Sequence, residues 1–183
     1  AKPEITRSEA LSLTALPGNC GIRSRSVAVL VDDGVDGKAV AIAQAALQAA
    51  GAKVHLIAPR LGPVKPASGE PFEATGTLEN SPAVLFDGLV LPEGAGGLEA
   101  ACVRIEVMDF ICNQYRHGKT ILALGASKAL LEQAGVALNL SNGEADPGIV
   151  LHPAGKGKPA VVDFIAALVR HRHPEREAGA LMC

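Results

Sequence analysis

Short apolar runs that are typical of strands alternate with helical segments along most of the chain. The first such unit comprises SVAVLV at 26–31, an Ala-rich segment at 38–50 with apolar residues every three or four positions, and KVHLIA at 53–58. Continuous apolar runs of this length are typical of strands that are buried on both faces of a parallel sheet. The segment therefore predicts a β-α-β unit, which requires a right-handed crossover.

The alternation of strand and helix patterns continues toward the end of the chain, with one interruption. Between 62 and 79 the sequence changes to glycine, proline and short alternating pieces, which predict an inserted hairpin. Strands that alternate with helices form a parallel sheet covered on both faces. We therefore predict an α/β fold that is three-layered and flavodoxin-like, with helices on both faces and one small inserted hairpin. The remaining strands are expected at 86–94, 119–124 and 148–151, and the remaining helices at 98–116, 127–134 and 161–170.

The first 24 residues differ in character from the rest of the chain. They are polar, contain prolines and glycines, and show no sustained periodicity, although the short piece ALSL at 10–13 could dock on another surface. We expect residues 1–24 to be a linker arm that adds little to the fold, and residues 25–183 to be one α/β domain. Because the chain does not begin with methionine, we expect it to be a domain cut from a longer polypeptide.

Charge and composition exclude several classes of partner. The net charge of −2 creates no field toward nucleic acid or anionic lipid, and 3% aromatic residues supply no stacking platform for single strands. The longest apolar stretch, 39–52, contains two glutamines and is shorter than the roughly 20 residues of a membrane span. We therefore expect no nucleic acid and no membrane as partner. Residues 70–109 carry eight acidic side chains and one basic one; a solvated surface is favoured over a docking face for a basic partner.

The four cysteines have no spacing that is typical of metal ligands. A chain of this length needs no disulfides to fold, so reduced thiols and a cytoplasmic location are expected. We expect no metal site and no cofactor within the chain itself. The cysteines are Cys20, Cys102, Cys112 and Cys183.

Ligands of open α/β sheets bind beyond the C-terminal ends of the strands, so the turns there are the candidate sites. The first turn, DDGVDG at 32–37, carries carboxylates that could hold a metal or act as a base. Asp36 is also placed to cap the following helix, and this interpretation is favoured. The second turn, Gly94–Gly97, resembles a dinucleotide loop, but the third glycine of that motif is replaced by Glu99, whose charge would repel a pyrophosphate.

The third turn, Gly125–Ser127, lies between a predicted strand and a predicted helix, where a nucleophile elbow would be placed. Ser127 would need a histidine base, and none of the five histidines obviously returns to this turn, so a helix N-cap is the favoured role for Ser127. The fourth turn, HPAGKGKP at 152–159, lacks the spacing of a phosphate-binding loop and is predicted to be exposed. His171 and His173 are expected near the end of the last helix, where cationic side chains suit the helix dipole.

Three segments resemble the glutamine-amidotransferase-like superfamily, which includes intracellular cysteine proteases, glyoxalases and related chaperones. They are VAVLVDDGVDG at 27–37, FDGLVLPEG at 86–94 and ILALGASKALLEQAG at 121–135. In that superfamily an acid after the first strand faces an elbow of the form A-I-C-H-G, followed by L-L-x-x-A-G. Alignment on LLEQAG implies that Gly125 replaces the nucleophilic cysteine, Ala126 the histidine and Ser127 the glycine. The resemblance therefore implies a vestigial elbow, with Asp36 as the vestigial acid.

One branch of that superfamily is similar to nearly the whole chain, from about Ala10 to Arg176. The segments GIRSRSVAVLV, GTLENSPAVLFDGLVLPEG and FIAALVRHRHPER resemble the C-terminal domain of large-subunit haem catalases. The resemblance implies a parent that converts hydrogen peroxide to water and oxygen at a haem. It also implies that the catalase body and the neighbouring subunits of a tetramer are the partners. The only tyrosine, Tyr115, lacks the family's haem-ligand motif, so we expect this chain alone to bind no haem and to catalyse nothing.

Three functions remain as hypotheses. The first is a non-catalytic catalase domain that supports stability, assembly or substrate access, with the chaperone-like activity described for some relatives. The second is a cysteine hydrolase or glyoxalase-type enzyme of the same superfamily with a degenerate site. The third is a ligand-binding or holdase module that uses a pocket around Asp36, Gly97 and Gly125.

Overall fold

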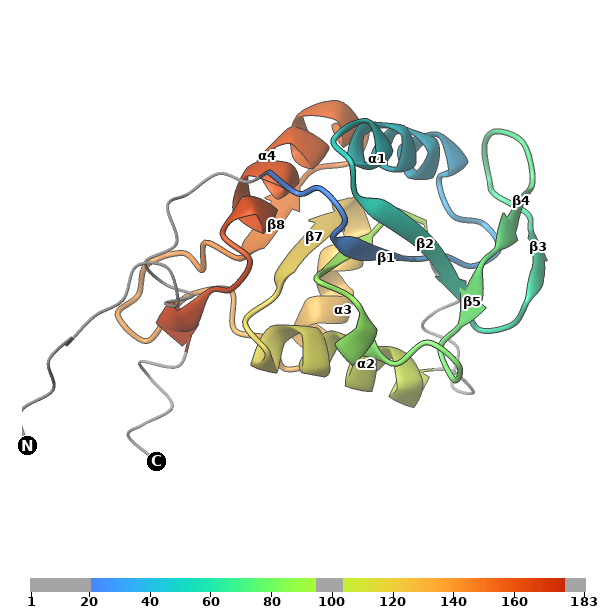
Figure 1. The fold of residues 1–183 in the computed structure, drawn as a ribbon. Helices are drawn as coiled ribbons and strands as arrows, with labels where there is room; N and C mark the ends of the chain where they lie inside the picture. Colours follow the sequence, from blue (N-terminus) through green and yellow to red (C-terminus); the bar gives the residue numbers. More distant parts are fainter. Residues whose placement is uncertain (1–20, 95–103, 177–183) are drawn as a thin grey trace, which may run out of the picture.

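The central element of the fold is a parallel sheet of six strands, seen in a computed structural model that describes residues 21–94 and 104–176. The strand order is β5-β2-β1-β6-β7-β8, and every neighbouring pair in this sheet is parallel (Figure 1). The strands are β1 (Ser26–Leu30), β2 (Lys53–Ala58), β5 (Gly76–Thr77), β6 (Gly88–Leu91), β7 (Thr120–Leu124) and β8 (Ile149–His152).

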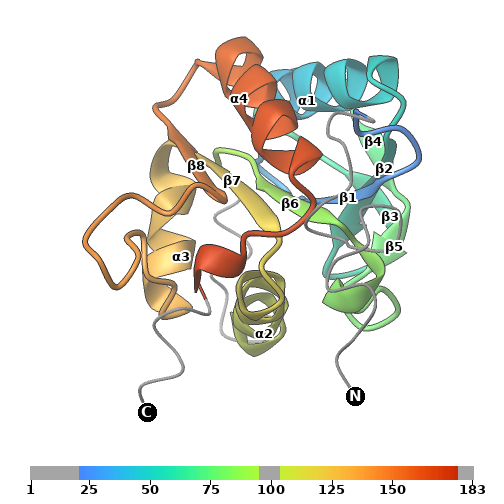
Figure 2. The ribbon, with the colours of Figure 1, turned by 60° about the vertical axis from the view of Figure 1, so that its left-hand side comes forward.

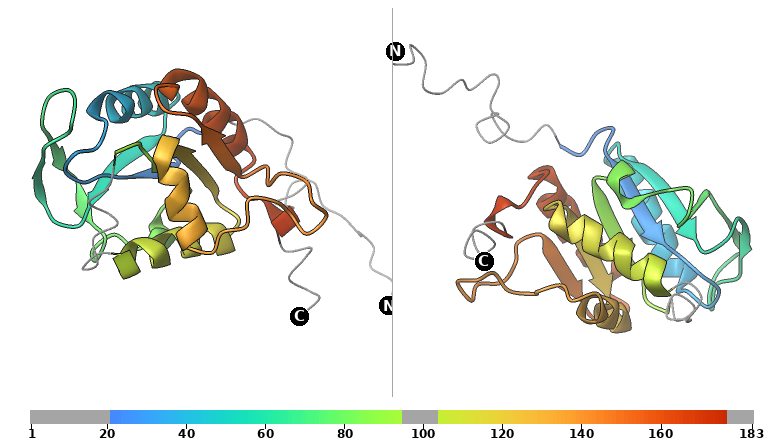
Figure 3. Two further views of the ribbon diagram at one scale, coloured as in Figure 1. Left: turned by 180° about the vertical axis from the view of Figure 1, so that it is seen from behind. Right: turned by 90° about the horizontal axis from the view of Figure 1, so that it is seen from below.

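Helices cover both faces of this sheet. Figure 2 shows α1 (Gly37–Ala49) and α4 (Gly157–Val169) side by side on one face. Seen from behind in Figure 3, α2 (Arg104–Arg116) and α3 (Lys128–Gln133) lie on the opposite face. The three-layered, flavodoxin-like α/β fold is therefore confirmed. None of the helices in the described ranges is long and apolar enough to cross a membrane.

Most predicted elements lie within a few residues of their expected positions. Helix α4 begins at Gly157, four residues before the expected start, so the exposed loop at 152–159 is shorter than predicted. The part of the predicted helix 98–116 that precedes residue 104 lies outside the described residues. The two-residue edge strand β5 and the short 3-10 helix η1 (Ala83–Leu85) were not predicted, because neither is long enough to produce a periodic pattern.

The core consists of aliphatic side chains on both faces of the sheet. All five residues of β7 are buried, as are all four residues of β6, which is the pattern expected of strands covered by helices on two sides. From the helices, Leu47, Ile111 and Phe164 are fully buried against the strands. A core built from alanine, valine, leucine and isoleucine explains how a chain with few aromatic residues folds.

The inserted hairpin is confirmed, and it packs over the loop that follows β1. Strand β3 (Gly62–Val64) pairs antiparallel with β4 (Phe72–Ala74). The hairpin loop is tied to the β1–α1 loop by two backbone hydrogen bonds, from Gly34 N to Lys65 O at 2.8 Å and from Ala67 N to Val35 O at 2.9 Å. At Gly37, the first residue of α1, a Cβ would lie 2.2 Å from Ser68 O. The start of α1 is therefore covered by the insertion.

The last four residues of the expected linker arm pack against the domain. Ile22 is 1% exposed and belongs to the hydrophobic core, and Ser24 N donates to Gly51 O at 2.8 Å. These contacts hold residues 22–24 against the domain, next to the turn that follows α1. Residues 1–20 lie outside the described residues, so the expectation for that part of the arm stays a prediction.

Candidate functional site

The strand order reverses between β1 and β6, and this switch point is where ligands bind in flavodoxin-like folds. Three loops leave the C-terminal ends of the strands there: residues 32–36 after β1, 92–94 after β6, and the 3-10 turn at 125–127 after β7. The first two loops are joined directly, because Asp36 N donates to Glu93 O at 2.8 Å. The candidate site is therefore assembled from three segments that are distant in sequence.

Asp36 caps helix α1, as the sequence predicted. Its Oδ1 accepts hydrogen bonds from Lys38 N at 3.0 Å and Ala39 N at 3.3 Å, and from Ser68 Oγ at 2.8 Å. Three donors on one oxygen hold the carboxylate in place at the helix N-terminus, which also favours negative charge. The hydrogen bonds therefore give Asp36 a structural role as the N-cap of α1.

Gly125 lies at the elbow, and the space above it is occupied. Its φ is +55°, in the left-handed region that favours glycine. A Cβ at this position would lie 2.8 Å from both Cδ and Oε1 of Glu93. The side chain of Glu93 therefore takes the place that a nucleophilic side chain on residue 125 would need.

Glu93 is the member of the site that sequence reasoning missed. The resemblance implies Asp36 as the vestigial acid, and the structure adds the Glu93 carboxyl, which lies 2.8 Å from the position of a Cβ on residue 125. One signal in the sequence could have identified it, since Glu93 follows a buried strand and precedes a glycine loop, and so lies at the ligand edge of the sheet.

Ser127 is neither an exposed nucleophile nor a functional cap. It stands at the N-cap position of α3, but its side chain makes no capping hydrogen bond; its hydroxyl donates instead to Pro92 O. Ser127 is also 6% exposed. Ala126 is exposed and carries no reactive group. Gly97, the third member of the proposed pocket, lies outside the described residues.

The histidines do not gather at the elbow in the described part of the chain. His55 packs edge-on against Phe86, and His152 contacts Asp163 at 2.8 Å. His171 lies 3.6 Å from Asp87, while His173 is bonded to Thr120. Cys112, the one cysteine within the described ranges, donates to Ala134 O through Sγ. Among the described residues, no group of three or more His, Cys, Asp or Glu side chains could hold a metal ion.

The segment after α4 is a structural anchor rather than an exposed helix end. The guanidinium of Arg176 contacts Asp146 through Nε–Oδ2 at 2.5 Å and Nη2–Oδ1 at 3.1 Å, with the two side chains 6% and 0% exposed. Arg176 Nη1 also donates to Tyr115 O at 3.2 Å and Lys119 O at 2.8 Å. The Arg176 side chain thus joins the segment after α4 to the C-terminal end of α2, to the start of β7 and to the loop before β8.

His173 is fully buried beside this anchor, which corrects the prediction of a helix-end histidine that offsets the dipole. It exchanges a 2.9 Å hydrogen bond with Thr120 Oγ1 through Nε2, while Nδ1 is buried without a partner among the described residues. Burial, and then the Arg176 and Arg170 guanidiniums, lower the pKa of His173 from 6.5 to about 4. The ring is therefore neutral at physiological pH.

Lys119 is a second buried basic group next to the anchor. It is 2% exposed, and its Nζ donates to the carbonyl oxygens of Ala83 at 3.0 Å and Val84 at 3.2 Å. Burial, followed by the Arg172 guanidinium, lowers the pKa of Lys119 from 10.5 to about 8. Both carbonyls belong to η1, so Lys119 fixes η1 against the start of β7.

Tyr115 does not fit the role of a haem ligand. A haem-ligating tyrosine binds iron as the tyrosinate. Burial, and then the Asp146 carboxylate, raise the pKa of the Tyr115 phenol above its usual 10.0. The Arg176 guanidinium, 4.6 Å from the ring centroid, opposes this shift but is a smaller cause than the other two. The environment therefore favours a protonated phenol that packs against the anchor.

The position of Glu93 predicts how reactive a cysteine introduced at residue 125 would be. We expect the Gly125→Cys thiol to react slowly with iodoacetamide while Glu93 is present, and severalfold faster when Glu93→Ala is added, because the glutamate fills the same space. In the double variant the thiol should also react faster than the half-buried Cys112. The positive φ should cost about 1 kcal/mol of stability in either variant.

Modification rates measured by mass spectrometry of the labelled peptides test this prediction. The Glu93→Ala variant without the new cysteine is the control for reactivity elsewhere in the chain. Equal rates for the single and double variants would show that Glu93 does not shield residue 125.

Comparison with known proteins gives a consistent result. The family model described as the C-terminal domain found in long catalases matches residues 23–178. Catalase HPII of Pseudomonas putida is 33% identical over 177 residues, which cover 97% of this chain and 23% of the relative. Catalase-2 of Bacillus subtilis is 32% identical over 180 residues, covering 96% and 24%. The chain thus spans about a quarter of the length of these catalases.

Solved structures agree with the observed fold. DJ-1beta of Drosophila melanogaster superimposes with a TM-score of 0.69 and 23% identity, covering 87% of this chain and 99% of that one. A ThiJ/PfpI family protein from Pseudomonas syringae gives a TM-score of 0.64 and 18% identity, covering 90% and 77%. These structural similarities establish the fold alone. The family match establishes membership: the chain belongs to the family of C-terminal domains found in long catalases.

Proposed function

We propose that this chain is a non-catalytic domain of a large-subunit catalase, which supports the stability, assembly or substrate access of a haem-containing body. The observation that carries the proposal is the filled elbow. Residue 125 has no side chain, its φ is positive, and Glu93 occupies the space that a nucleophile would need. Glycine supplies no nucleophile at this turn, and the Glu93 side chain lies where one on residue 125 would project.

The proposal assigns the chemistry to the part of the parent that this chain does not include. The parent reaction would be the conversion of hydrogen peroxide to water and oxygen at a haem, in a cytoplasmic tetramer. The partners of this domain would be the catalase body and neighbouring subunits. Support comes from the share of each catalase that the chain covers, about a quarter, and from the protonated state favoured at Tyr115.

The chain alone is expected to be inert toward haem and peroxide. Because Tyr115 is held as a phenol against Arg176, added haem should give no Soret band at stoichiometric intensity, and peroxide should release no oxygen. Absorbance titration and an oxygen electrode measure the two quantities. A stoichiometric Soret band together with oxygen evolution would overturn this expectation.

The supporting role is tested in a full-length catalase that carries this domain. The domain is removed from residue 21 onward, where the described residues begin. The half-time of thermal inactivation and the subunit stoichiometry are then compared with those of the intact enzyme. A shorter half-time or a loss of tetramers supports the proposal. Unchanged values for stability, assembly and peroxide turnover contradict it.

Chaperone-like activity is a second candidate, favoured by an exposed apolar surface. Val84 and Leu85 on η1 are 67% and 60% exposed, and Ile105 on the adjoining α2 is 74% exposed. Val84 and Leu85 are adjacent on η1, and exposed apolar side chains that lie side by side are typical of protein-binding surfaces. Suppression of the aggregation of a heated client protein by the isolated chain tests this function, and replacement of these three residues by serine is the matched control.

A further inference from the structure

A hollow of about 270 Å³ lies at the edge of the sheet opposite to the switch point. It is formed where α2 ends, just before β7 begins, and where the chain continues beyond α4. This edge holds the N-terminal ends of the parallel strands, so the hollow is separate from the elbow. Its lining residues are Arg116, His117, Gly118, Arg172, His173 and Pro174.

Positive charge in this hollow has no paired carboxylate among the residues that the structure describes. None of the lining residues is acidic, and in the described part of the chain neither Arg116 nor Arg172 lies within ion-pair distance of a carboxylate. The other two arginines of residues 170–176 are paired with carboxylates. Arg170 contacts Glu175, and Arg176 is held by the buried Asp146. The two lining arginines are therefore the ones left without a partner carboxylate in this part of the structure.

A second hollow in the same molecule shows the opposite arrangement. It measures about 320 Å³ and lies beside the β1–α1 loop, where Arg60 and Lys65 share the lining with Asp32 and Asp33. Asp33 also accepts a hydrogen bond from Lys65 N at 2.8 Å. Basic side chains in that hollow share the lining with two carboxylates, which makes Arg60 a matched control for the arginines of the first hollow.

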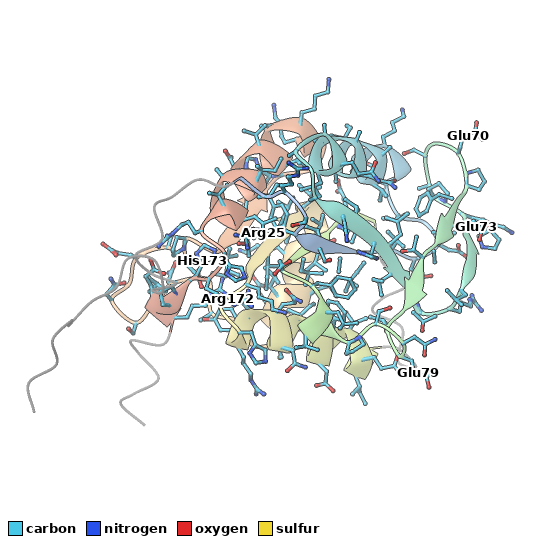
Figure 4. All side chains as sticks on the ribbon, viewed as in Figure 1. Arg25, Glu70, Glu73, Glu79, Arg172 and His173 are labelled. Atoms are coloured by element: carbon cyan, nitrogen blue, oxygen red, sulfur yellow. The ribbon has the colours of Figure 1, made fainter. Side chains whose placement is uncertain are left out.

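Further basic side chains lie on the same side of the molecule as this hollow. Figure 4 shows Arg25, Arg172 and His173 toward one end and three exposed glutamates toward the other end. The pKa of His171 is lowered by burial and then by Arg172 and Arg25, which is the direction expected where the potential is positive. Basic residues near helix C-termini interact favourably with the terminal carbonyls, but this does not explain a hollow whose lining excludes carboxylates.

We propose that this hollow binds a small oxyanion of the phosphate class between the guanidiniums of Arg116 and Arg172. Guanidinium groups donate two parallel hydrogen bonds to oxyanions, and two of them can share one doubly charged group. A volume of about 270 Å³ is several times the roughly 30 Å³ that one water occupies in the liquid, so a phosphate group fits. His117 lies in the lining as a further donor. The site does not depend on the function proposed above.

Titration of the 183-residue chain with inorganic phosphate and with pyrophosphate, at constant ionic strength, tests the site. Isothermal titration calorimetry should show saturable binding of one anion per chain, and the imidazole resonances of His117 should shift over the same concentrations. Arg116→Gln and Arg172→Gln should each weaken binding about tenfold, as expected for the loss of a charge-assisted hydrogen bond. The double variant should abolish saturable binding.

The Arg60→Gln variant should bind as the unmodified chain does, because Arg60 belongs to the other hollow. Arg116 and Arg172 are both exposed, so their replacement should leave the unfolding midpoint unchanged, which thermal denaturation verifies. The proposal is overturned if binding does not saturate, or if Arg60→Gln weakens it as much as Arg172→Gln does. Equal binding of chloride at the same ionic strength would overturn it as well.

Discussion

Replacing Arg176 by alanine is expected to lower the free energy of unfolding by about 3–5 kcal/mol, the usual cost of breaking a buried ion pair. The Asp146 side chain is 0% exposed, so its charge would remain buried without a partner. The carbonyl oxygens of Tyr115 and Lys119 would lose a donor at the same time. Urea denaturation followed by far-ultraviolet circular dichroism measures the change.

Two further variants show how much of the lost unfolding free energy comes from the uncompensated charge of Asp146. Arg170→Ala removes the exposed pair with Glu175 and should cost no more than about 1 kcal/mol. Adding Asp146→Asn to Arg176→Ala should recover part of the lost stability, because it removes the uncompensated charge. If Arg176→Ala costs no more than Arg170→Ala, the ending does not anchor the domain.

Acid should destabilise the domain through His173. The folded-state pKa of about 4 lies below the unfolded value of 6.5, so the unfolded chain binds more protons at pH values between the two. Stability is therefore fully present above pH 6.5 and falls as the pH decreases toward 4. A pKa difference of this size corresponds to about 3 kcal/mol. Urea unfolding at a series of pH values from 7 to 4 measures the loss.

The His173→Gln variant isolates this contribution. A glutamine can accept the hydrogen bond of Thr120 but does not titrate, so its stability should fall less steeply between pH 6.5 and 4 than that of the unmodified chain. Parallel pH profiles for the unmodified chain and His173→Gln would show that protonation of His173 does not drive acid unfolding.

The layers of the fold could be predicted because their signals are local. Strands β1, β6 and β7 each carry an uninterrupted apolar run, and α1 follows the spacing of an amphipathic helix up to Gly51. The same local logic identified Asp36 as a cap, since a capping side chain bonds to amides two or three residues away. A two-residue strand such as β5 has no such signal, because its place depends on pairing with β2.

The residues that decide the site could not be found in this way. Glu93 meets Gly125, Ser127 bonds to Pro92, and Arg176 reaches Asp146, in each case across 30 or more positions of sequence. A carboxylate that follows a strand and an arginine near a helix end are both common on exposed surfaces. Only the packing of the three layers brings these pairs together, so their roles depend on the tertiary structure.

Because the Glu93 side chain lies where a side chain on residue 125 would project, the effects of mutations at these two positions are expected to depend on each other. A cysteine gained first at 125 would meet both the strain of a positive φ and the Glu93 side chain, so it would be destabilising and shielded. Loss of Glu93 alone would open the elbow without supplying a reactive group. Mutations of contacting residues are often not additive, so the effect of a cysteine at 125 is expected to depend on which side chain stands at 93.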